Sequence, residues 1–219
     1  MNNGKQNKND AIRILVVEDH EVVRDGFVAL INREPGLIVC AEAAGAQEAL
    51  SMIDQHNPDL IIADLLLNEG DGIELLKDAK SAHPDTPFLI ISMQDEEVYA
   101  ERCLKNGASG YIMKHSATDE FLEAIQTIMA GDIYLSKRMN ARLLQRVARG
   151  SSEGRTGLDA LTDRELQVYQ LIGAGLNPRE IGPRLGISPK TVATHRENIK
   201  TKLGMKDGRS LLHAAMNNL

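Results

Sequence analysis

The sequence contains no tryptophan, three phenylalanines and four tyrosines, so its hydrophobic core has to be built mainly from aliphatic side chains. No apolar stretch approaches the roughly 20 residues that a membrane-spanning helix needs, which argues against a membrane protein. The polar start, residues 1–11, lacks the apolar centre of a signal peptide and predicts a disordered N-terminal tail. Only two cysteines occur, Cys40 and Cys103, without metal-ligand spacing; they predict a buried, reduced pair and a cytoplasmic location.

The net charge of −6 is distributed unevenly along the 219 residues. Residues 1–150 contain 15 basic and 24 acidic side chains, whereas residues 151–219 contain 10 basic and 7 acidic side chains. This difference predicts two domains with different partners. The basic excess of the second part is modest, so its charge alone does not identify a nucleic-acid-binding domain.

Apolar strand patterns alternate with helical patterns through the first 131 residues. Each predicted strand is followed by apolar residues at helical spacing, and the segments end at turn signals such as Pro35-Gly36 and Gly107. The strict alternation predicts an α/β fold over residues 12–131, with a doubly wound five-stranded parallel sheet. The predicted strands are residues 12–17, 37–40, 60–63, 87–91 and 110–113.

Polar side chains directly follow four of these strands. Right-handed crossovers place the carboxyl ends of parallel strands at one end of the sheet, where ligands bind in such folds. Taken singly, an acid here is an ordinary cap for the next loop or helix, and a lysine is an ordinary solvated side chain. The presence of five suitable groups at one end of the sheet favours a reactive site, made of Glu18, Asp19, Asp64, Ser92 and Lys114.

Carboxylates gathered in one place repel each other unless a cation neutralises them, and oxygen ligands of this kind suit Mg²⁺. The expected metal ligands are Glu18, Asp19, Asp64 and the backbone carbonyl of Leu66. Asp64 would then act as a nucleophile towards a phosphoryl group and form an acyl phosphate. Lys114 would pair with one phosphoryl oxygen, and Ser92 would donate its hydroxyl to another.

A linker separates this domain from the rest of the chain. Residues 132–157 show a helical pattern from Lys137 to Arg149, followed by a Gly- and Ser-rich stretch that is typical of flexible linkers. Beyond it, residues 158–219 show helical patterns only. The sequence therefore predicts a small all-α second domain.

Helix starts are well marked in this second domain. Thr162 and Glu165 predict a capping box, and Asn177-Pro178 predicts the start of the next helix. After a break at Gly186, Ser188-Pro189 starts a longer helix. Two short helices with a glycine-containing turn before a capped second one predict a helix-turn-helix DNA-binding domain.

The helix predicted from Ser188 to Leu203 would be the recognition helix in a major groove. Glu197 would accept a hydrogen bond from a cytosine amine or, equally, repel the phosphates, and Ala193 would touch a thymine methyl group. His195 is at helical spacing from apolar neighbours, which favours partial packing over base reading. The candidate DNA contacts are Lys190, Thr191, Ala193, Thr194, His195, Arg196, Glu197, Lys200 and Lys202, of which the last two are equally well read as solvated lysines.

With these motifs, residues 12–131 resemble the flavodoxin-like receiver domain of bacterial two-component response regulators. Residues 158–219 resemble the helix-turn-helix domain of the LuxR/NarL/FixJ type. The resemblance implies that Asp64 is the phosphoacceptor and that Tyr111 is the aromatic switch residue whose orientation follows Ser92. The segment Gly107-Ala108-Ser109-Gly110-Tyr111 is especially similar to this subfamily.

The resemblance implies a cytoplasmic regulator of transcription that a sensor histidine kinase phosphorylates on Asp64 and that binds double-stranded DNA. It also implies a homodimer when phosphorylated or on DNA, with the last helix, residues 209–216, as the pairing surface. Leu211, Leu212 and Ala215 of that helix are equally well interpreted as core residues, and Leu211 favours the core. One departure is that Leu67-Asn68 replaces the Met-Pro that usually follows the phosphorylated aspartate, while Gly72 is retained. The loss of proline predicts a less rigid loop and altered phosphorylation kinetics.

Two other functions stay open on the sequence. The chain would be a phosphorylation-independent transcription factor if its receiver served only as a dimerisation platform. It would be a phosphohydrolase if Asp64 turned over repeatedly. Phosphohydrolases of this type carry a second aspartate two residues further on, where this chain has Leu66, so we do not expect a multiple-turnover enzyme.

Overall fold

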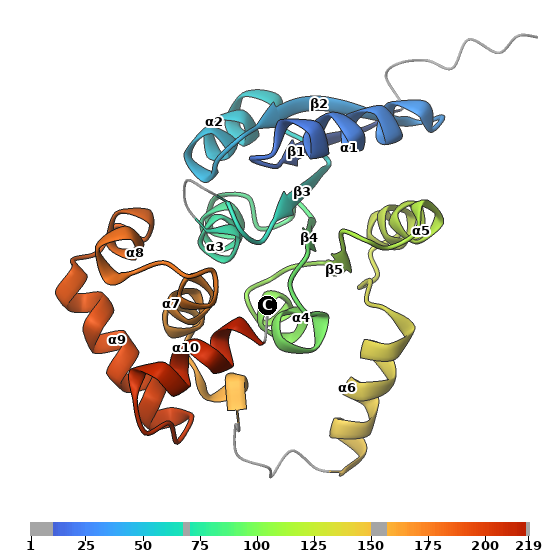
Figure 1. The fold of residues 1–219 in the computed structure, drawn as a ribbon. Helices are drawn as coiled ribbons and strands as arrows, with labels where there is room; N and C mark the ends of the chain where they lie inside the picture. Colours follow the sequence, from blue (N-terminus) through green and yellow to red (C-terminus); the bar gives the residue numbers. More distant parts are fainter. Residues whose placement is uncertain (1–10, 68–70, 150–156, 218–219) are drawn as a thin grey trace, which may run out of the picture. The chain divides into compact units, whose positions relative to one another are not determined.

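The computed structural model describes residues 11–67, 71–149 and 157–217, and the chain divides into two compact units, Met1–Asn140 and Ala141–Leu219. Strands and helices alternate in the first unit (Figure 1). They are β1 (Ile12–Val17), α1 (Glu21–Arg33), β2 (Leu37–Ala43), α2 (Ala46–His56), β3 (Leu60–Asp64), α3 (Gly72–Ala82), β4 (Phe88–Ser92), α4 (Glu96–Lys105), β5 (Gly110–Met113) and α5 (Thr118–Met129).

The five strands form one parallel sheet in the order β2-β1-β3-β4-β5. The predicted doubly wound α/β fold is therefore confirmed. All five residues of β3 are buried, as expected for the central strand of a sheet that has helices on both faces. This position explains why the sequence of β3 is a continuous apolar run and not an alternating one.

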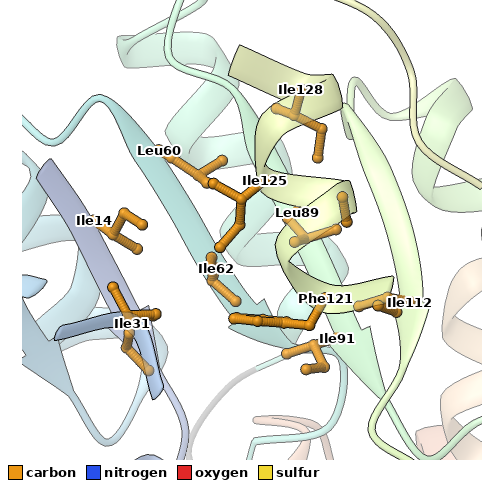
Figure 2. Packing of buried hydrophobic residues seen from close by; sticks show 12 residues of the cluster. Ile14, Ile31, Leu60, Ile62, Leu89, Ile91, Ile112, Phe121, Ile125 and Ile128 are labelled. Carbon is orange, nitrogen blue, oxygen red and sulfur yellow. The ribbon is translucent and has the colours of Figure 1, made fainter. Parts of the chain in front are cut away.

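One face of the sheet packs against α1 and α5. Figure 2 shows Phe121, Ile125 and Ile128 of α5 against isoleucines and leucines of the strands. The ring of Phe27 in α1 stacks on that of Phe121, with ring centroids 5.5 Å apart. The core is thus mainly aliphatic, with few aromatic rings, as the composition predicts.

The segment after α5 continues to pack on the first unit. The backbone of Tyr134 accepts a hydrogen bond from Tyr111 N (3.1 Å) and donates one to Ser109 O (3.0 Å), which covers the outer edge of β5. Leu135 and Met139 are buried. The sequence predicted that the first domain ends at residue 131. These contacts extend beyond that residue and reach the start of α6 (Lys137–Arg149).

The second unit is helical, as predicted. Its elements are the 3-10 turn η1 (Gly157–Ala160), α7 (Asp163–Gly173), α8 (Pro178–Arg184), α9 (Pro189–Lys202) and α10 (Gly208–Met216). The predicted capping box of Thr162 and Glu165 is present, and Asn177 and Glu180 form another. Val192, Ile199 and Leu211 are fully buried, so α9 and α10 both contribute to the core of this unit.

Within the described ranges, none of the helices has the length and apolar character needed to span a membrane.

Candidate functional site

Asp64 is the last residue of the central strand, and its neighbour across the sheet is Ile91 of β4. Only 4% of the residue is exposed. One carboxylate oxygen, Oδ1, accepts a hydrogen bond from the backbone N–H of Leu66 at 3.2 Å. The strand therefore holds a carboxylate in a nearly dry position at the carboxyl end of the sheet, where the sequence predicted a reactive group.

Lys114 connects two of the predicted carboxylates. Its Nζ lies 2.8 Å from Oδ2 of Asp64 and 2.5 Å from Oε2 of Glu18. Burial raises the pKa of the Asp64 carboxyl, and the Lys114 ammonium offsets only part of this effect. Burial by itself lowers the pKa of Lys114, but the two carboxylates outweigh it and the net pKa is raised. Lys114 is therefore a stable positive charge beside Asp64.

Glu18, Asp19 and His20 form an acidic loop between β1 and α1. One ligand atom from each of these side chains lies within 4.8 Å of the others, and Glu18 is buried. Carboxylate oxygens at this separation fit a hard divalent cation such as Mg²⁺. Asp64 is linked to Glu18 of this loop by Lys114, whose ammonium contacts both carboxylates.

His20 was not among the predicted site residues. Its Nδ1 lies 2.9 Å from Oδ1 of Asp19 and 3.2 Å from Oε1 of Glu18. Both carboxylates raise the pKa of the imidazole, and the effect of Asp19 is larger than that of Glu18. The side chain is 68% exposed, so it lies at the mouth of the acidic site. Its place directly after Glu18-Asp19 was the signal in the sequence.

Gly72 brings α3 against the backbone of the phosphoacceptor candidate. A Cβ atom at this position would lie 2.4 Å from the carbonyl oxygen of Asp64 and 2.7 Å from Cα of Leu65. The adjacent Asp71 is buried, and its Oδ1 accepts from the N–H groups of Ile73 and Glu74, which starts α3 at this point. The retained glycine is thus explained by a close approach of two backbones.

The two predicted switch residues meet at Gln94 in the loop before α4. The backbone N–H of Gln94 donates to Ser92 Oγ at 3.2 Å, and the Tyr111 hydroxyl donates to the Gln94 carbonyl at 2.7 Å. Both residues are buried, and burial raises the pKa of Tyr111 well above its usual value. Tyr111 therefore keeps its proton and points inward. Nothing in the sequence pattern indicated the role of Gln94.

The loop after β3 departs from the usual Met-Pro sequence at Leu67-Asn68. Leu67 is buried, with 8% of its surface exposed, so the leucine fills apolar space. Asn68 lies outside the described residues. The prediction of altered phosphorylation kinetics is therefore untested.

The candidate DNA contacts divide into two groups on α9. Lys190, Ala193, Thr194 and Glu197 are exposed along one side of the helix, and Lys202 is exposed at its last residue. Thr191, His195, Arg196 and Lys200 are partly buried, and the buried Nδ1 of His195 has no hydrogen-bond partner among the residues that the structure describes.

Ion pairs constrain two of the lysines. Lys202 Nζ lies 2.6 Å from Oε2 of the buried Glu165 in α7, which links the two helices. Lys200 Nζ lies 2.8 Å from Oε2 of Glu197, so part of the negative charge of Glu197 is neutralised. Asn198 and Thr201 are also exposed on α9 and were not predicted, although helical spacing from Thr194 and Glu197 would have found them.

Comparison with known proteins finds the same two parts. Residues 14–126 match the response regulator receiver domain, and residues 159–215 match the luxR family of bacterial regulatory proteins. The oxygen regulatory protein NreC of Staphylococcus carnosus (strain TM300) is 32% identical over 210 residues, which cover 94% of this chain and 97% of NreC.

Solved structures are similar as well. A two-component response regulator of the LuxR family from Aurantimonas sp. SI85-9A1 is 34% identical with a TM-score of 0.60, and the match covers 63% of this chain and 99% of that one. RcsB from Salmonella enterica serovar Typhimurium, bound to the promoter rprA in the presence of the phosphomimetic BeF3-, has a TM-score of 0.71 at 21% identity. That match covers 94% of this chain and 98% of RcsB and concerns the fold.

Proposed function

The chain belongs to the DNA-binding response regulators of two-component systems, which join a receiver domain to a LuxR-type helix-turn-helix domain, and we propose that phosphorylation of Asp64 controls its binding to DNA. The observation that carries the proposal is the contact of Lys114 with both Asp64 and Glu18 at the carboxyl end of the sheet. This arrangement provides a nucleophile, a fixed positive charge and an acidic site side by side.

Asp64 is the nucleophile in the proposed reaction. A carboxylate oxygen attacks the phosphorus atom, the bond from phosphorus to the donor breaks, and its electron pair leaves with the donor. Lys114 exchanges its contact with Glu18 for one with a phosphoryl oxygen, and the Leu66 N–H holds the other carboxylate oxygen. Glu18, Asp19, Asp64 and the backbone carbonyl of Leu66 would hold a Mg²⁺ ion, which would supply positive charge that offsets the charge of the phosphoryl oxygens.

Gln94 couples the phosphoryl group to the rest of the domain. Ser92 accepts a hydrogen bond from the Gln94 N–H, and its hydroxyl turns to donate to a phosphoryl oxygen when one is present. Because Tyr111 binds the carbonyl of Gln94, a movement of this loop also reaches Tyr111 and α4. The phosphoryl group thereby biases a two-state surface around α4, β5 and α5.

The proposed DNA interface is the exposed side of α9. Its helix start is capped by Ser188, whose Oγ accepts from Thr191 N at 3.1 Å, and Lys190, Thr194 and Thr201 lie on the exposed side. Such a helix fits a major groove, with basic groups on phosphates and polar groups on base edges. RcsB structures have been solved as dimers on DNA, which supports a homodimer here. The proposed phosphodonor is a sensor histidine kinase. The proposed location is the cytoplasm, where the chain can reach DNA.

Phosphorylation is tested with the full chain, Mg²⁺ and acetyl phosphate. We expect intact-mass spectrometry to find one added phosphoryl group, which Asp64→Asn abolishes and Asp78→Asn, an exposed aspartate on α3, retains. The mass increase should not exceed one phosphoryl group per chain, since Asp64 is the single acceptor in the proposal. No mass increase in the wild type would refute the phosphorylation claim.

Control of DNA binding is tested by fluorescence anisotropy on DNA fragments selected from random sequence. We expect acetyl phosphate to tighten binding of the wild type and to leave Asp64→Asn unchanged. Thr194→Ala should weaken binding to the selected fragments more than binding to competitor DNA. Lys190→Ala should weaken binding to both and reduce the salt dependence of the affinity. Equal affinity of wild type and Asp64→Asn, with and without phosphodonor, would favour the alternative in which the receiver is only a dimerisation platform.

A further inference from the structure

Arg24 lies near the start of α1 and contacts the backbone of the acidic loop. Its Nη1 donates a hydrogen bond to the backbone carbonyl of Glu18 at 2.7 Å. Its Nε lies 3.3 Å from Oε2 of Glu42, near the end of β2. The Arg24 side chain is 19% exposed and that of Glu42 is 45% exposed, so the carbonyl contact is the more shielded of the two.

The contact completes the anchoring of Glu18. On its other side, the backbone N–H of Glu18 donates to the carbonyl of Ala43 in β2 at 3.0 Å. The residue is thus held by β2 through its N–H and by α1 through its C=O. The side chains of Glu18 and Asp19 both project from this short segment of backbone. The directions of their carboxylates therefore depend on these backbone contacts.

We propose that Arg24 is a positioning residue for the divalent-cation site: it fixes the Glu18 carbonyl so that the carboxylates of Glu18 and Asp19 face Asp64. The inference rests on the proposed function and adds a residue that touches neither the cation nor the phosphoryl group. Groups that hydrogen-bond directly to a metal-ligand side chain commonly change metal affinity about 10- to 100-fold when they are removed. Because Arg24 acts on the backbone of a ligand residue, we expect an effect near the lower end of that range.

The chemistry of the guanidinium explains why an arginine stands here. Arg24 satisfies a backbone carbonyl with one nitrogen and a carboxylate with another, in a fixed planar geometry. A lysine has a single nitrogen on a flexible stem and reaches both acceptors less well. The pair with Glu42 contributes little by itself, because an exposed ion pair is screened by water.

The test measures cation binding directly on the full chain. Mn²⁺ binding is followed by electron paramagnetic resonance, and Mg²⁺ is measured by competition. We expect Arg24→Gln to weaken binding at least about 10-fold and Arg24→Lys to have an intermediate effect. Arg33→Gln, an exposed arginine in the last turn of the same helix, should leave binding unchanged, and Glu42→Gln should change it less than about fivefold.

Phosphorylation by acetyl phosphate supplies a second readout. In Arg24→Gln the Mg²⁺ concentration for half-maximal rate should rise by the same factor as the dissociation constant, while the rate at saturating Mg²⁺ stays near that of the wild type. A merely structural role would instead lower the rate at every Mg²⁺ concentration. If circular dichroism finds that Arg24→Gln is unfolded, the same measurements are made on Arg24→Lys.

Two results would overturn the inference. One is a wild-type dissociation constant for Mn²⁺ in folded Arg24→Gln, and the other is a slower reaction with an unchanged Mg²⁺ dependence. Either leaves the proposed function intact, provided that the wild type binds Mn²⁺ and accepts the phosphoryl group. A wild type that does neither would refute the proposed function and this inference with it.

Discussion

At the scale of single residues, the site depends on backbone positions as much as on its charged side chains. Gly72 faces the carbonyl of Asp64 at a distance that leaves no room for a Cβ atom. Gln94 presents its N–H to Ser92 and its carbonyl to Tyr111, so one peptide segment contacts both switch residues. Gly72 and Gln94 position the backbone of the site. Because they are neither charged nor nucleophilic, a search of the sequence for such residues does not find them.

Gly72→Ala should destabilise the receiver by about 1–3 kcal/mol, because the added methyl group forces the backbones of α3 and β3 apart. It should also slow phosphorylation, since the displaced segment includes Asp64. The free energy of unfolding is measured from hydrogen exchange of the β3 amides in the full chain.

Gly26→Ala in the middle of α1 is the matched control, because a Cβ atom there meets no atom of the described part of the chain within 4 Å. It should stabilise the domain slightly, by about 0.5–1 kcal/mol, since alanine is the better helix former. If both variants behaved alike, the close approach at Gly72 would not matter for the site.

At the scale of elements, α7 and α9 are joined by the contact between Glu165 and Lys202. Burial by itself raises the pKa of Glu165, but the hydrogen bonds from Lys202 and from Thr162 outweigh it, and the net pKa is lowered from 4.5. A lowered pKa in the folded state means that the unfolded state binds protons more readily. The contribution to stability is therefore complete above about pH 4.5 and is lost as the pH falls through the folded pKa.

Glu165→Gln should remove this part of the acid sensitivity of the second unit. We expect the protection of α7 amides against hydrogen exchange to fall less steeply between pH 5 and about pH 3.5 than in the wild type. Glu197→Gln is the control, since the Glu197 side chain is 70% exposed in its pair with Lys200. An unchanged slope in Glu165→Gln would rule out a role of the pair in acid stability.

The sequence predicted the elements well and the contacts between elements poorly, for a physical reason. Strands such as β3 and helix starts such as Thr162 to Glu165 are encoded by neighbouring residues, so periodicity and capping rules find them. The positions of Asp64 and Lys114 directly after their strands likewise predicted that the two residues lie at the same end of the sheet.

Contacts between a side chain and a distant backbone leave no periodic signal. The hydroxyl of Ser136 donates to Glu96 Oε2 at 2.5 Å, which attaches the start of α6 to α4, and Arg24 reaches Glu18 in the same unpredicted way. The inward orientation of Tyr111 also depends on a carbonyl from another element. Such contacts follow from the tertiary fold and not from the local sequence.

At the scale of the whole molecule, the extent of the receiver domain follows from the segment after α5. Shortening the chain to residues 1–131 would remove the Tyr134 hydrogen bonds along β5 and the buried side chains of Leu135 and Met139. Because each buried aliphatic side chain contributes about 1.5–3 kcal/mol, we expect residues 1–131 to be less stable than residues 1–140 by at least about 3 kcal/mol. Urea unfolding of the two fragments measures the difference, and equal midpoints would place the boundary at residue 131.

The order of strands in the sheet has a consequence for the speed of folding. In the receiver, β3 lies between β1 and β4, and its pairing with β1 joins Ile14 to Leu60 across an intervening strand and two helices. In the second unit, the backbone hydrogen bonds within α7, α8, α9 and α10 join residues four apart, so a larger share of its contacts is local in sequence. Because folding slows as contacts become more distant along the chain, the helical second unit should fold faster than the receiver. Refolding from urea should thus show a rapid helical phase followed by a slower one that buries Tyr111.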